Sequence, residues 1–424
     1  MPLIFDNNKN IILTKIALSD ILKHGEGKMT EKIYLDNAST TRINAEVLNE
    51  MNKVYTNTFG NSSSLHSFGR EASSLIDDSR DTIANAINAK RNEIYFTSSG
   101  SEANSWAIIG IAYANKAKGN HIITSKIEHE SVLQACKYLE KNGFKVTYLD
   151  VDKNGFINFA ALLRAITDKT ILISIMAANN EIGTIQNIKA ISHVAHDKNI
   201  VFHTDCVQLF GHMNLDVKDL GIDAMTISAH KIYGPKGVGA LYLSNNVAID
   251  PIIFGGNQER SRRGGTCNTA GIVGFAKATE IAMRDMAINN HKIRALSEYF
   301  VSKITASIEN IIINAETKQK LPNIISICFV GVDGESLLTK LDLAGVAVST
   351  GSACTSNSLA VSHVISAIGL KTDDAKSTIR FSIGKNNSYE ELDEAVAIIK
   401  KSVEDLREYS STYGLKIRKR KGDN

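Results

Sequence analysis

A lysine stands directly after a predicted strand in the stretch Thr226-Ile-Ser-Ala-His230-Lys231. In open α/β sheets, the carboxyl ends of the strands form the crevice in which ligands bind. A lysine buried there loses its hydration, which lowers the pKa of the amine and makes it a nucleophile toward aldehydes. Because a lysine at a strand end can also simply reach the surface, this stretch alone favours neither interpretation.

A carboxylate ends the preceding predicted strand, in Val201-Phe-His-Thr-Asp205. A single aspartate at this point is better explained as a helix cap. Beside a strand-end lysine it has a second explanation, because the pyridine nitrogen of a pyridoxal cofactor needs an acidic partner that keeps it protonated. Lys231 and Asp205 together therefore indicate pyridoxal phosphate held as a Schiff base.

A turn of small residues, Thr97-Ser-Ser-Gly100-Ser101, joins a predicted strand to a predicted helix. Backbone N–H groups at a helix N-terminus bind phosphate, although small residues before a helix are also ordinary caps. The sequence has no Walker A loop and no Gly-x-Gly-x-x-Gly after a strand, which counts against a nucleotide site. The turn therefore suits an anion such as phosphate, but ordinary capping explains it equally well.

A histidine, His129, follows another predicted strand at the same edge of the sheet. An imidazole at this point could stack on an aromatic cofactor and carry protons. Taken alone, a structural histidine held by hydrogen bonds explains it better.

One cysteine stands in a stretch of turn-forming residues, Ser349-Thr-Gly-Ser-Ala-Cys354-Thr-Ser-Asn-Ser358. Free cysteines are usually small buried hydrophobes, whereas this composition favours an exposed and mobile loop. A thiol on such a loop is expected to have a chemical role.

Seven short β-branched runs alternate with amphipathic helical stretches, which is typical of βα units around a mainly parallel sheet. The predicted strands are Ile94–Thr97, His121–Thr124, Lys145–Leu149, Ile171–Ile175, Ile200–His203, Ala224–Ser228 and Gly239–Leu243. The predicted helices between them include Glu102–Ala117, Glu130–Lys141 and Ile188–Lys198. A long helical pattern over Ala287–Glu309, followed by strands at Ile324–Phe329 and Val346–Ser349, predicts a second, smaller α/β domain.

Composition bounds the function classes that remain. The chain has 424 residues with 48 basic and 45 acidic side chains, and this excess of 48 − 45 = 3 is too small to indicate a nucleic-acid-coated surface. Its five cysteines include no Cys-x-x-Cys pair, which argues against a structural zinc site and against a disulfide framework. No apolar run approaches the roughly 20 residues of a membrane helix. We therefore expect a protein of a reducing compartment that binds neither nucleic acid nor membrane directly.

Several stretches match the sequence motifs of one enzyme family and occur in the same order along the chain. They are Ile33-Tyr-Leu-Asp-Asn-Ala-Ser-Thr-Thr41, Phe59-Gly-Asn-Ser-Ser-Ser-Leu-His66, Asn179-Asn180-Glu-Ile-Gly183, Ser228-Ala-His-Lys-Ile-Tyr-Gly-Pro-Lys-Gly237 and Gly351-Ser-Ala-Cys-Thr-Ser356. From about residue 32 to about residue 408, the chain resembles the pyridoxal-phosphate-dependent cysteine desulfurases of the class V aminotransferase superfamily. It departs from the family pattern at Ser62, Ala177 and Cys206, none of which removes a catalytic group.

The resemblance implies fold type I of the pyridoxal-phosphate-dependent transferases, an α/β fold with a large domain built on a mainly parallel seven-stranded sheet and a smaller α/β domain. The large cofactor-binding domain would span residues 41–287, and residues 33–40 and 288–410 would form the small domain. Residues 1–32 would be an N-terminal extension and residues 411–424 a basic tail. Because residues 1–28 match nothing in the family and Met29 precedes the first matching strand, the extension could be optional.

For the cofactor, the resemblance assigns a role to each candidate side chain. Lys231 matches the lysine that holds pyridoxal phosphate covalently, Asp205 matches the partner of the pyridine nitrogen, and His129 matches the histidine stacked over the ring. Gln208 and Asn180 match residues that hydrogen-bond the phenolic oxygen of the ring or the substrate nearby.

For the phosphate and the substrate, the resemblance implies a cradle and an anchor. The cradle would consist of Gly100, Ser101, Ser228 and His230, with Thr266 reaching it from the other subunit of a homodimer. Arg380 resembles the arginine that binds the carboxylate of the substrate, for which a guanidinium group is suited because its planar fork matches a carboxylate bidentately.

The implied activity is the conversion of L-cysteine to L-alanine, a transferase reaction in which Cys354 accepts the sulfur as a persulfide. The motif around Cys354 is similar to that of the group with a longer, mobile cysteine loop, which donates sulfur to several acceptors. The expected partners are sulfur-acceptor proteins, such as an iron–sulfur scaffold for cluster assembly or a relay protein for tRNA thiolation. We expect a cytoplasmic enzyme, with mitochondria or a related organelle as the alternative.

Three other interpretations would explain part of these observations. A selenocysteine lyase or another class V aminotransferase would share Lys231 and Asp205 but would not need a loop cysteine. A cysteine hydrolase that uses Cys354 with His363 would need neither Lys231 nor a phosphate cradle. A degenerate homologue could act only as a binding partner, but intact catalytic positions count against it.

Overall fold

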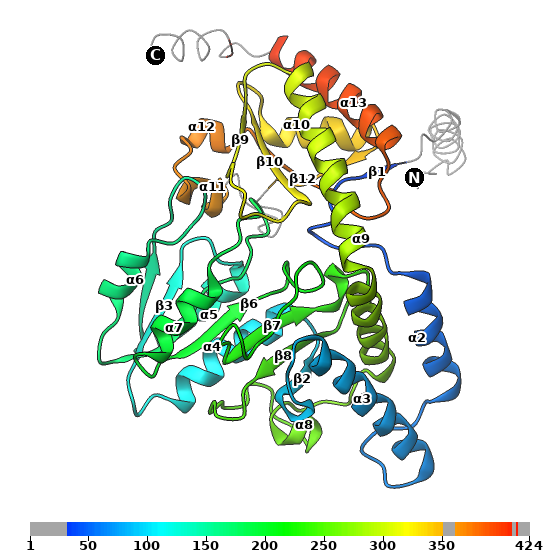
Figure 1. Cartoon of the computed structure of the whole chain (residues 1–424), viewed down its shortest axis with the longest axis vertical. Coiled ribbons are helices and arrows are strands. Elements are labelled where there is room, and N and C mark those ends of the chain that lie inside the picture. The colour runs from blue at the N-terminus through cyan, green and yellow to red at the C-terminus, as the bar shows by residue number, and fades with distance from the viewer. Residues whose placement is uncertain (1–31, 351–360, 409–412, 414–424) are drawn as a thin grey trace, which may run out of the picture.

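The computed structural model describes residues 32–350, 361–408 and 413 (Figure 1). Seven strands form its main sheet in the order β2-β8-β7-β6-β5-β3-β4. They are β2 (Ile94–Thr97), β3 (His121–Ser125), β4 (Lys145–Leu149), β5 (Thr170–Ser174), β6 (Val201–Asp205), β7 (Ala224–Ser228) and β8 (Gly239–Leu243). Only β8 runs antiparallel to its neighbours, β2 and β7. The prediction of a mainly parallel seven-stranded sheet is therefore confirmed.

Helices cover both faces of this sheet, and every residue of β2, β3, β5, β7 and β8 is accordingly buried. The helices of this part are α2 (Ala45–Asn57), α3 (Ser67–Ala86), α4 (Gly100–Ala114), α5 (Glu130–Lys141), α6 (Phe159–Ala165), α7 (Ile188–His196) and α8 (Gln258–Ser261). Two short 3₁₀ turns, η1 (Arg91–Glu93) and η2 (Ala229–Lys231), precede β2 and follow β7. The three helices predicted in this region lie within a few residues of their observed bounds.

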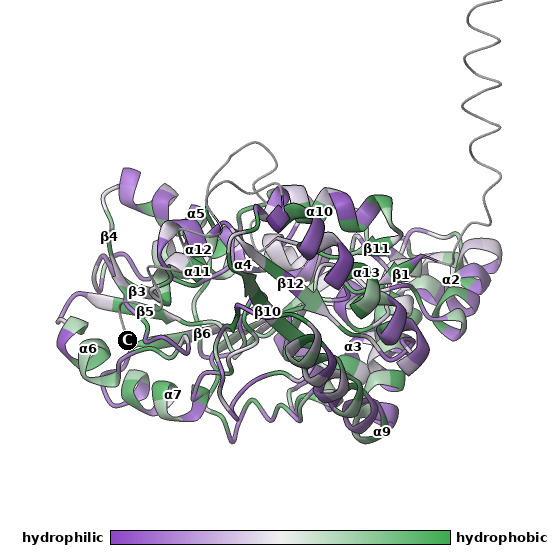
Figure 2. Ribbon diagram, turned by 90° about the horizontal axis from the view of Figure 1, so that it is seen from above, coloured by the Kyte–Doolittle hydropathy of each residue, from purple (hydrophilic) through white to green (hydrophobic). Residues whose placement is uncertain are grey.

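A second α/β unit lies above the main sheet in Figure 1 and has its own apolar core. Its elements are β1 (Ile33–Tyr34), β9 (Ile311–Ile313), β10 (Ile324–Phe329), α10 (Gly334–Leu343), β11 (Val346–Ala347), α11 (His363–Ala367), α12 (Thr372–Ala375), β12 (Thr378–Ser382) and α13 (Tyr389–Glu408). β10 pairs antiparallel with β9 and β12, and β1 pairs parallel with β11. Figure 2 shows β10 as a hydrophobic strand, with hydrophilic residues on the surrounding helices.

One long helix, α9 (Thr269–Ser307), runs from the main sheet to the second unit, where it packs against α13. The sequence pattern predicted a helix only from Ala287, so the predicted start was wrong. The helix begins at Thr269, and Gly274 in its second turn is buried against Met51 of α2, where a larger side chain would clash. The expected domain boundary at residues 287–288 falls inside this helix, and the division into domains stays a prediction.

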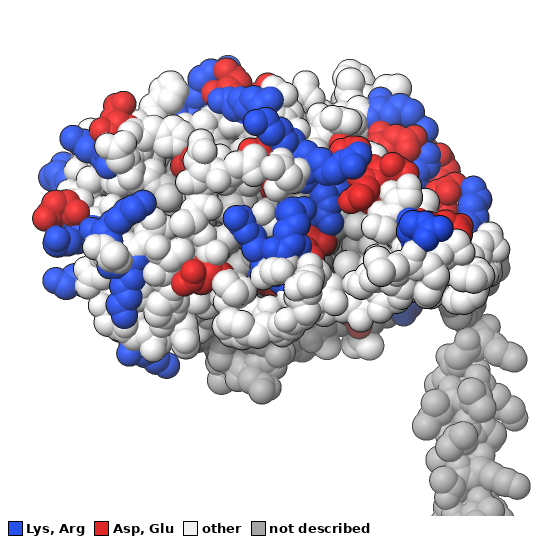
Figure 3. All heavy atoms as spheres, turned by 90° about the horizontal axis from the view of Figure 1, so that it is seen from below, with Lys and Arg blue, Asp and Glu red and all other residues white. Residues whose placement is uncertain are grey.

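Within the described residues, each helix is either too short or too polar to cross a bilayer. Figure 3 shows basic and acidic side chains mixed over the face seen from below, with a group of basic side chains near its middle.

A buried histidine links three strands beneath the carboxyl edge of the sheet. His203 of β6 lies 2.8 Å through Nδ1 from Ser174 Oγ of β5, and 3.1 Å through Nε2 from Thr226 Oγ1 of β7. Burial lowers the pKa of this imidazole from 6.5 to about 3, so that it is neutral in the folded protein at neutral pH. Its two hydrogen bonds fix the strand that ends two residues later at Asp205.

We predict that His203 makes the folded state less stable as pH falls below 6.5, because the unfolded chain then binds a proton that the folded protein refuses. His203→Gln removes this titration. The difference in unfolding free energy between pH 6.5 and pH 5 should therefore be smaller in the variant, by up to about 1.4 kcal/mol per pH unit. Urea unfolding at a series of pH values measures this slope. Equal slopes for variant and wild type would contradict the prediction.

Candidate active site

A cavity of about 510 Å³ opens at the carboxyl ends of the central strands. Its lining includes most of the predicted site residues, namely Gly100, Ser101, His129, Asn180, Asp205, Gln208, Ser228, His230, Lys231 and Arg380. Thr266 lines a different cavity, and Cys354 lies outside the described residues. The strand order explains the gathering, because the parallel strands β3, β5, β6 and β7 all end at this edge.

Lys231 ends the short turn η2, directly after β7. Its Nζ donates hydrogen bonds to the carbonyl oxygens of Ala38 at 2.6 Å and Ser39 at 2.7 Å. A half-buried amine at this edge, held by backbone carbonyls within a cavity, suits covalent attachment to an aldehyde.

Asp205 ends β6, beside β7, and only 6% of it is exposed. Its Oδ2 accepts a hydrogen bond of 2.7 Å from Asn104 Nδ2, and its Oδ1 accepts one of 2.9 Å from the N–H of Val207. The sequence analysis missed this role of Asn104. Asn104 lies one helical turn after Gly100 on α4, and this spacing places both residues on the same face of the helix.

The cradle for an anion begins where α4 begins. Ser99 caps this helix by accepting a hydrogen bond of 3.1 Å from the N–H of Glu102, and the first N–H groups of a helix have no partners within it. A Cβ atom at Gly100 would lie only 2.9 Å from Val207 Cγ2, so glycine keeps this approach open. Ser228 Oγ is buried and has no hydrogen-bond partner among the described residues. A phosphate group would supply that missing partner, and the residues present therefore fit pyridoxal phosphate.

Two neutral imidazoles line the same cavity. Burial lowers the pKa of His129; the carboxylate of Asp205 opposes this shift and Lys231 adds to it. His129 Nδ1 accepts a hydrogen bond of 3.1 Å from the N–H of Ser131 at the start of α5. Burial, together with the charges of Lys231 and Lys236, lowers the pKa of His230 to about 4. Both imidazoles are therefore uncharged at neutral pH.

Arg380 of β12 enters the cavity from the second unit and is 4% exposed. Its Nη2 donates to Asp36 Oδ1 at 2.8 Å and to Ser39 Oγ at 2.5 Å, and its Nη1 donates to the carbonyl oxygen of Asn180 at 2.9 Å. The buried Nε has no hydrogen-bond partner among the described residues. The guanidinium group is thus held in place with a donor left for a further acceptor, which a substrate carboxylate would be.

Residues 36–41 contact several of the predicted site residues at once. Besides the bonds to Lys231 and Arg380, the carbonyl oxygen of Ala38 accepts a hydrogen bond of 3.0 Å from Gln208 Nε2. Thr41 donates through its N–H and its hydroxyl to the carbonyl oxygen of His230, at 3.0 and 2.9 Å. The family motif had pointed to this segment, but its spacing could not show that it pairs with side chains from both units.

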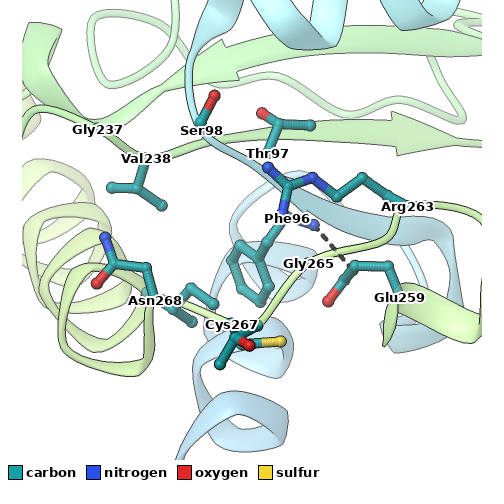
Figure 4. A pocket seen from close by; sticks show the side chains of 12 residues that line it. Phe96, Thr97, Ser98, Gly237, Val238, Glu259, Arg263, Gly265, Cys267 and Asn268 are labelled. Carbon is teal, nitrogen blue, oxygen red and sulfur yellow. Dashed lines mark hydrogen bonds between the residues drawn. The ribbon is translucent and has the colours of Figure 1, made fainter. Parts of the chain in front are cut away.

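Thr266 lines a second cavity of about 210 Å³. Figure 4 shows Thr97, Ser98 and Arg263 in the lining of this cavity. Arg263 fixes the loop before Thr266 through two hydrogen bonds to Glu102, of 2.7 and 3.0 Å. Glu259 accepts a hydrogen bond from the N–H of Phe96 and forms a buried ion pair with Arg80. The loop that carries Thr266 is therefore rigid but does not reach the cavity that holds Lys231.

The chain is similar to known proteins over nearly its whole described length. Residues 33–395 match the family model described as aminotransferase class V. A cysteine desulfurase IscS from Clostridium botulinum is 49% identical over 384 residues, which cover 90% of this chain and 97% of the relative. A solved NifS-like protein is 36% identical, with a TM-score of 0.84 and coverage of 88% of this chain and 100% of its own. SspA, solved in complex with cysteine, is 35% identical, with a TM-score of 0.76 and coverage of 84% and 100%.

We predict that Lys231→Ala abolishes covalent attachment of pyridoxal phosphate, because the amine of Lys231 lines the same cavity as Asp205. Borohydride reduction followed by peptide mass spectrometry should find the cofactor on Lys231 in the wild type and on no peptide of the variant. Lys236→Ala, a change at an exposed lysine of the same loop, is the matched control and should keep the label. Covalent cofactor in the Lys231→Ala variant would show that the attachment site was assigned wrongly.

Proposed function

The chain belongs to the aminotransferase class V family and is a pyridoxal-phosphate-dependent cysteine desulfurase, and from this premise we propose that Cys354 is the thiol that accepts the sulfur. The bound cofactor supplies an electron-withdrawing ring that weakens the carbon–sulfur bond of L-cysteine. The Cys354 thiolate attacks the substrate sulfur, and a sulfur–sulfur bond forms as the carbon–sulfur bond breaks. The electron pair of the broken bond stays on carbon, which takes a proton and becomes the methyl group of L-alanine. The enzyme thiol is oxidised to a persulfide while the carbon is reduced, so no external oxidant is needed.

The observation that carries this proposal is the bond between the Cys354 segment and the arginine in the cavity. Ser349 and Arg380 exchange two backbone hydrogen bonds, of 2.7 and 3.2 Å. Cys354 follows Ser349 by five residues, and an extended chain of that length spans at most roughly 18 Å. The covalent chain therefore keeps the thiol within reach of a substrate whose carboxylate binds Arg380.

Within the cavity, we propose that Arg380 and Asn180 orient the amino acid and that His129 carries the proton. The Nε of Arg380 has no hydrogen-bond partner among the described residues, which supports the first role, because a carboxylate there completes a guanidinium group that is already fixed by Asp36 and Ser39. The position of His129 in the cavity beside Lys231 supports the second, and burial lowers the pKa of its imidazole, so that the ring is neutral and can exchange a proton with the substrate.

An enzyme that ends its reaction as a persulfide passes the sulfur to an acceptor protein. We propose an iron–sulfur scaffold and a tRNA-thiolation relay protein as the acceptors. Both fit a thiol on a segment that turn-forming residues surround. The cytoplasmic location likewise stays a prediction.

We propose a homodimer whose interface includes the start of α3. Exposed apolar side chains gather there, with Phe59 at 75%, Leu65 at 90% and Phe68 at 50% exposure, and the rings of Phe59 and Phe68 lie 5.4 Å apart. Ser62, in the same stretch, hydrogen-bonds Cys267, the residue after Thr266. A second copy seated on this surface would bury the apolar side chains and bring the partner subunit's Thr266 toward the phosphate cradle, which Thr266 does not reach within its own chain.

We predict that Cys354→Ser binds pyridoxal phosphate and L-cysteine but forms almost no alanine, because the cofactor and carboxylate sites are unchanged while the sulfur acceptor is lost. The defect should exceed the roughly 10²–10⁴-fold effect of losing one acid–base group. Alanine release, mass spectrometry of the persulfide and sulfur delivery to an acceptor protein are the measurements. Cys136→Ala, which removes a buried thiol outside the cavity, is the control. Near wild-type sulfur delivery by Cys354→Ser would refute the assignment.

A second prediction concerns the dimer. Leu65→Asp should shift the protein toward monomers, because two charged side chains would face an apolar interface. Light scattering after size-exclusion chromatography, at a series of concentrations, measures the shift. Leu163→Asp is the matched control, since Leu163 is 55% exposed on α6, away from the proposed interface. If Leu65→Asp and Leu163→Asp have the same molar mass at every concentration, the interface was assigned to the wrong surface.

A further inference from the structure

The helix that follows the Cys354 segment packs beneath two loops of the cavity. α11 begins at His363, and the side chains of Val364 and Ile365 are each 1% exposed. They belong to an apolar cluster with Ile127 and Ile182. Ile127 stands two residues before His129, and Ile182 stands two residues after Asn180. Packing therefore ties the chain downstream of Cys354 to both loops.

The residue before the helix adds a polar bond to one of these loops. Ser362 Oγ donates a hydrogen bond of 2.6 Å to Glu181 Oε2, and both residues are buried. The same oxygen accepts from the N–H of Val364 and so caps the helix. A cap requires only that acceptor role, so the bond to Glu181 is additional. Glu181 directly follows Asn180, whose carbonyl oxygen accepts from Arg380.

The first residue of the helix makes the corresponding bond to the other loop. His363 Nε2 lies 2.9 Å from the carbonyl oxygen of Glu128, and because a carbonyl only accepts, this nitrogen carries the hydrogen. His363 Nδ1 lies 3.7 Å from Glu130 Oε1. Glu128 and Glu130 flank His129 in the sequence. His363 therefore bonds to the backbone on one side of the imidazole in the cavity and lies beside a carboxylate on the other side.

Glu128 completes the fixation of that loop from the opposite side. Its buried carboxyl group accepts hydrogen bonds from Ser125 Oγ at 2.5 Å and from the N–H of Met176 at 3.0 Å. The loop with His129 is thus held between the end of β5 and α11.

We propose that Ser362 and His363 are positioning residues for sulfur transfer: they hold the carboxyl-terminal end of the Cys354 segment in register with the loops that carry Asn180 and His129. The inference rests on the proposed role of Cys354. Ser349 fixes the other end of the segment to Arg380, and Ser362 lies eight residues beyond Cys354. The residues at both ends of the segment are therefore bonded to residues of the substrate site. This limits the positions at which the thiol can meet the substrate sulfur.

The test compares Ser362→Ala and His363→Leu holoenzymes with Ser366→Ala and His193→Leu, which alter exposed residues of α11 and α7. The cofactor spectrum and the KM for L-cysteine should stay within about twofold of wild type. The single-turnover rate of persulfide formation and the kcat for alanine should fall by roughly 10–100-fold, because a misplacement of about 1 Å has effects of this size. The controls should keep wild-type rates.

Two further readouts separate positioning from a general structural effect. His363→Gln retains an N–H that can donate to the carbonyl oxygen of Glu128, so it should recover more of the persulfide rate than His363→Leu. Turnover of L-selenocysteine should fall less than turnover of L-cysteine, because the weaker carbon–selenium bond depends less on attack by a placed thiolate. If Ser362→Ala fails to fold, the two His363 variants decide the question.

Wild-type persulfide rates in both Ser362→Ala and His363→Leu would overturn the inference, as would equal losses for L-cysteine and L-selenocysteine. Cys354→Ser, measured alongside, distinguishes this failure from failure of the proposed function. An inactive Cys354→Ser with wild-type positioning variants would overturn only the inference. An active Cys354→Ser would overturn the assignment of Cys354 and with it the inference.

Discussion

Two cations at the edge of a sheet, Lys231 and Arg380, must have acceptors in the folded protein, because a charge removed from water is costly unless it is paired or hydrogen-bonded. One short segment, residues 36–41, supplies acceptors to both, from carbonyl oxygens, a hydroxyl and the carboxylate of Asp36. This segment follows β1, which pairs with β11 in the second unit, and it bonds to the turn after β7 in the main sheet. The hydrogen bonds that Lys231 and Arg380 require thus join the beginning, the middle and the end of the chain.

The elements of the main sheet could be predicted because most of its strands are short apolar runs and five of the seven are buried along their whole length, which leaves a local signal. The gathering of the site could also be predicted, since Asp205, Ser228 and Lys231 stand at the ends of neighbouring parallel strands. The start of α9 could not, because the reason for Gly274 lies in a close approach to Met51, a residue more than 200 positions away.

Hydrogen-bond partners that are remote in the sequence could likewise not be predicted from the sequence pattern. Asn104 and Asp205 are 101 positions apart, and Asp36 and Arg380 are 344 positions apart, so no periodicity connects them. The position of Thr266 in its own cavity agrees with a contribution to another chain but does not test it. From the sequence alone, His363 could also be the histidine of a cysteine hydrolase, because it stands near Cys354. In the structure, its Nε2 bonds to the carbonyl oxygen of Glu128 instead.

The continuous helix α9 has a mechanical consequence. Its 39 residues make a rod of about 58 Å, which packs against α2 and α3 at one end and α13 at the other. A hinge between the two units would have to bend this rod or break its backbone hydrogen bonds. The continuous helix therefore opposes a hinge motion between the two units.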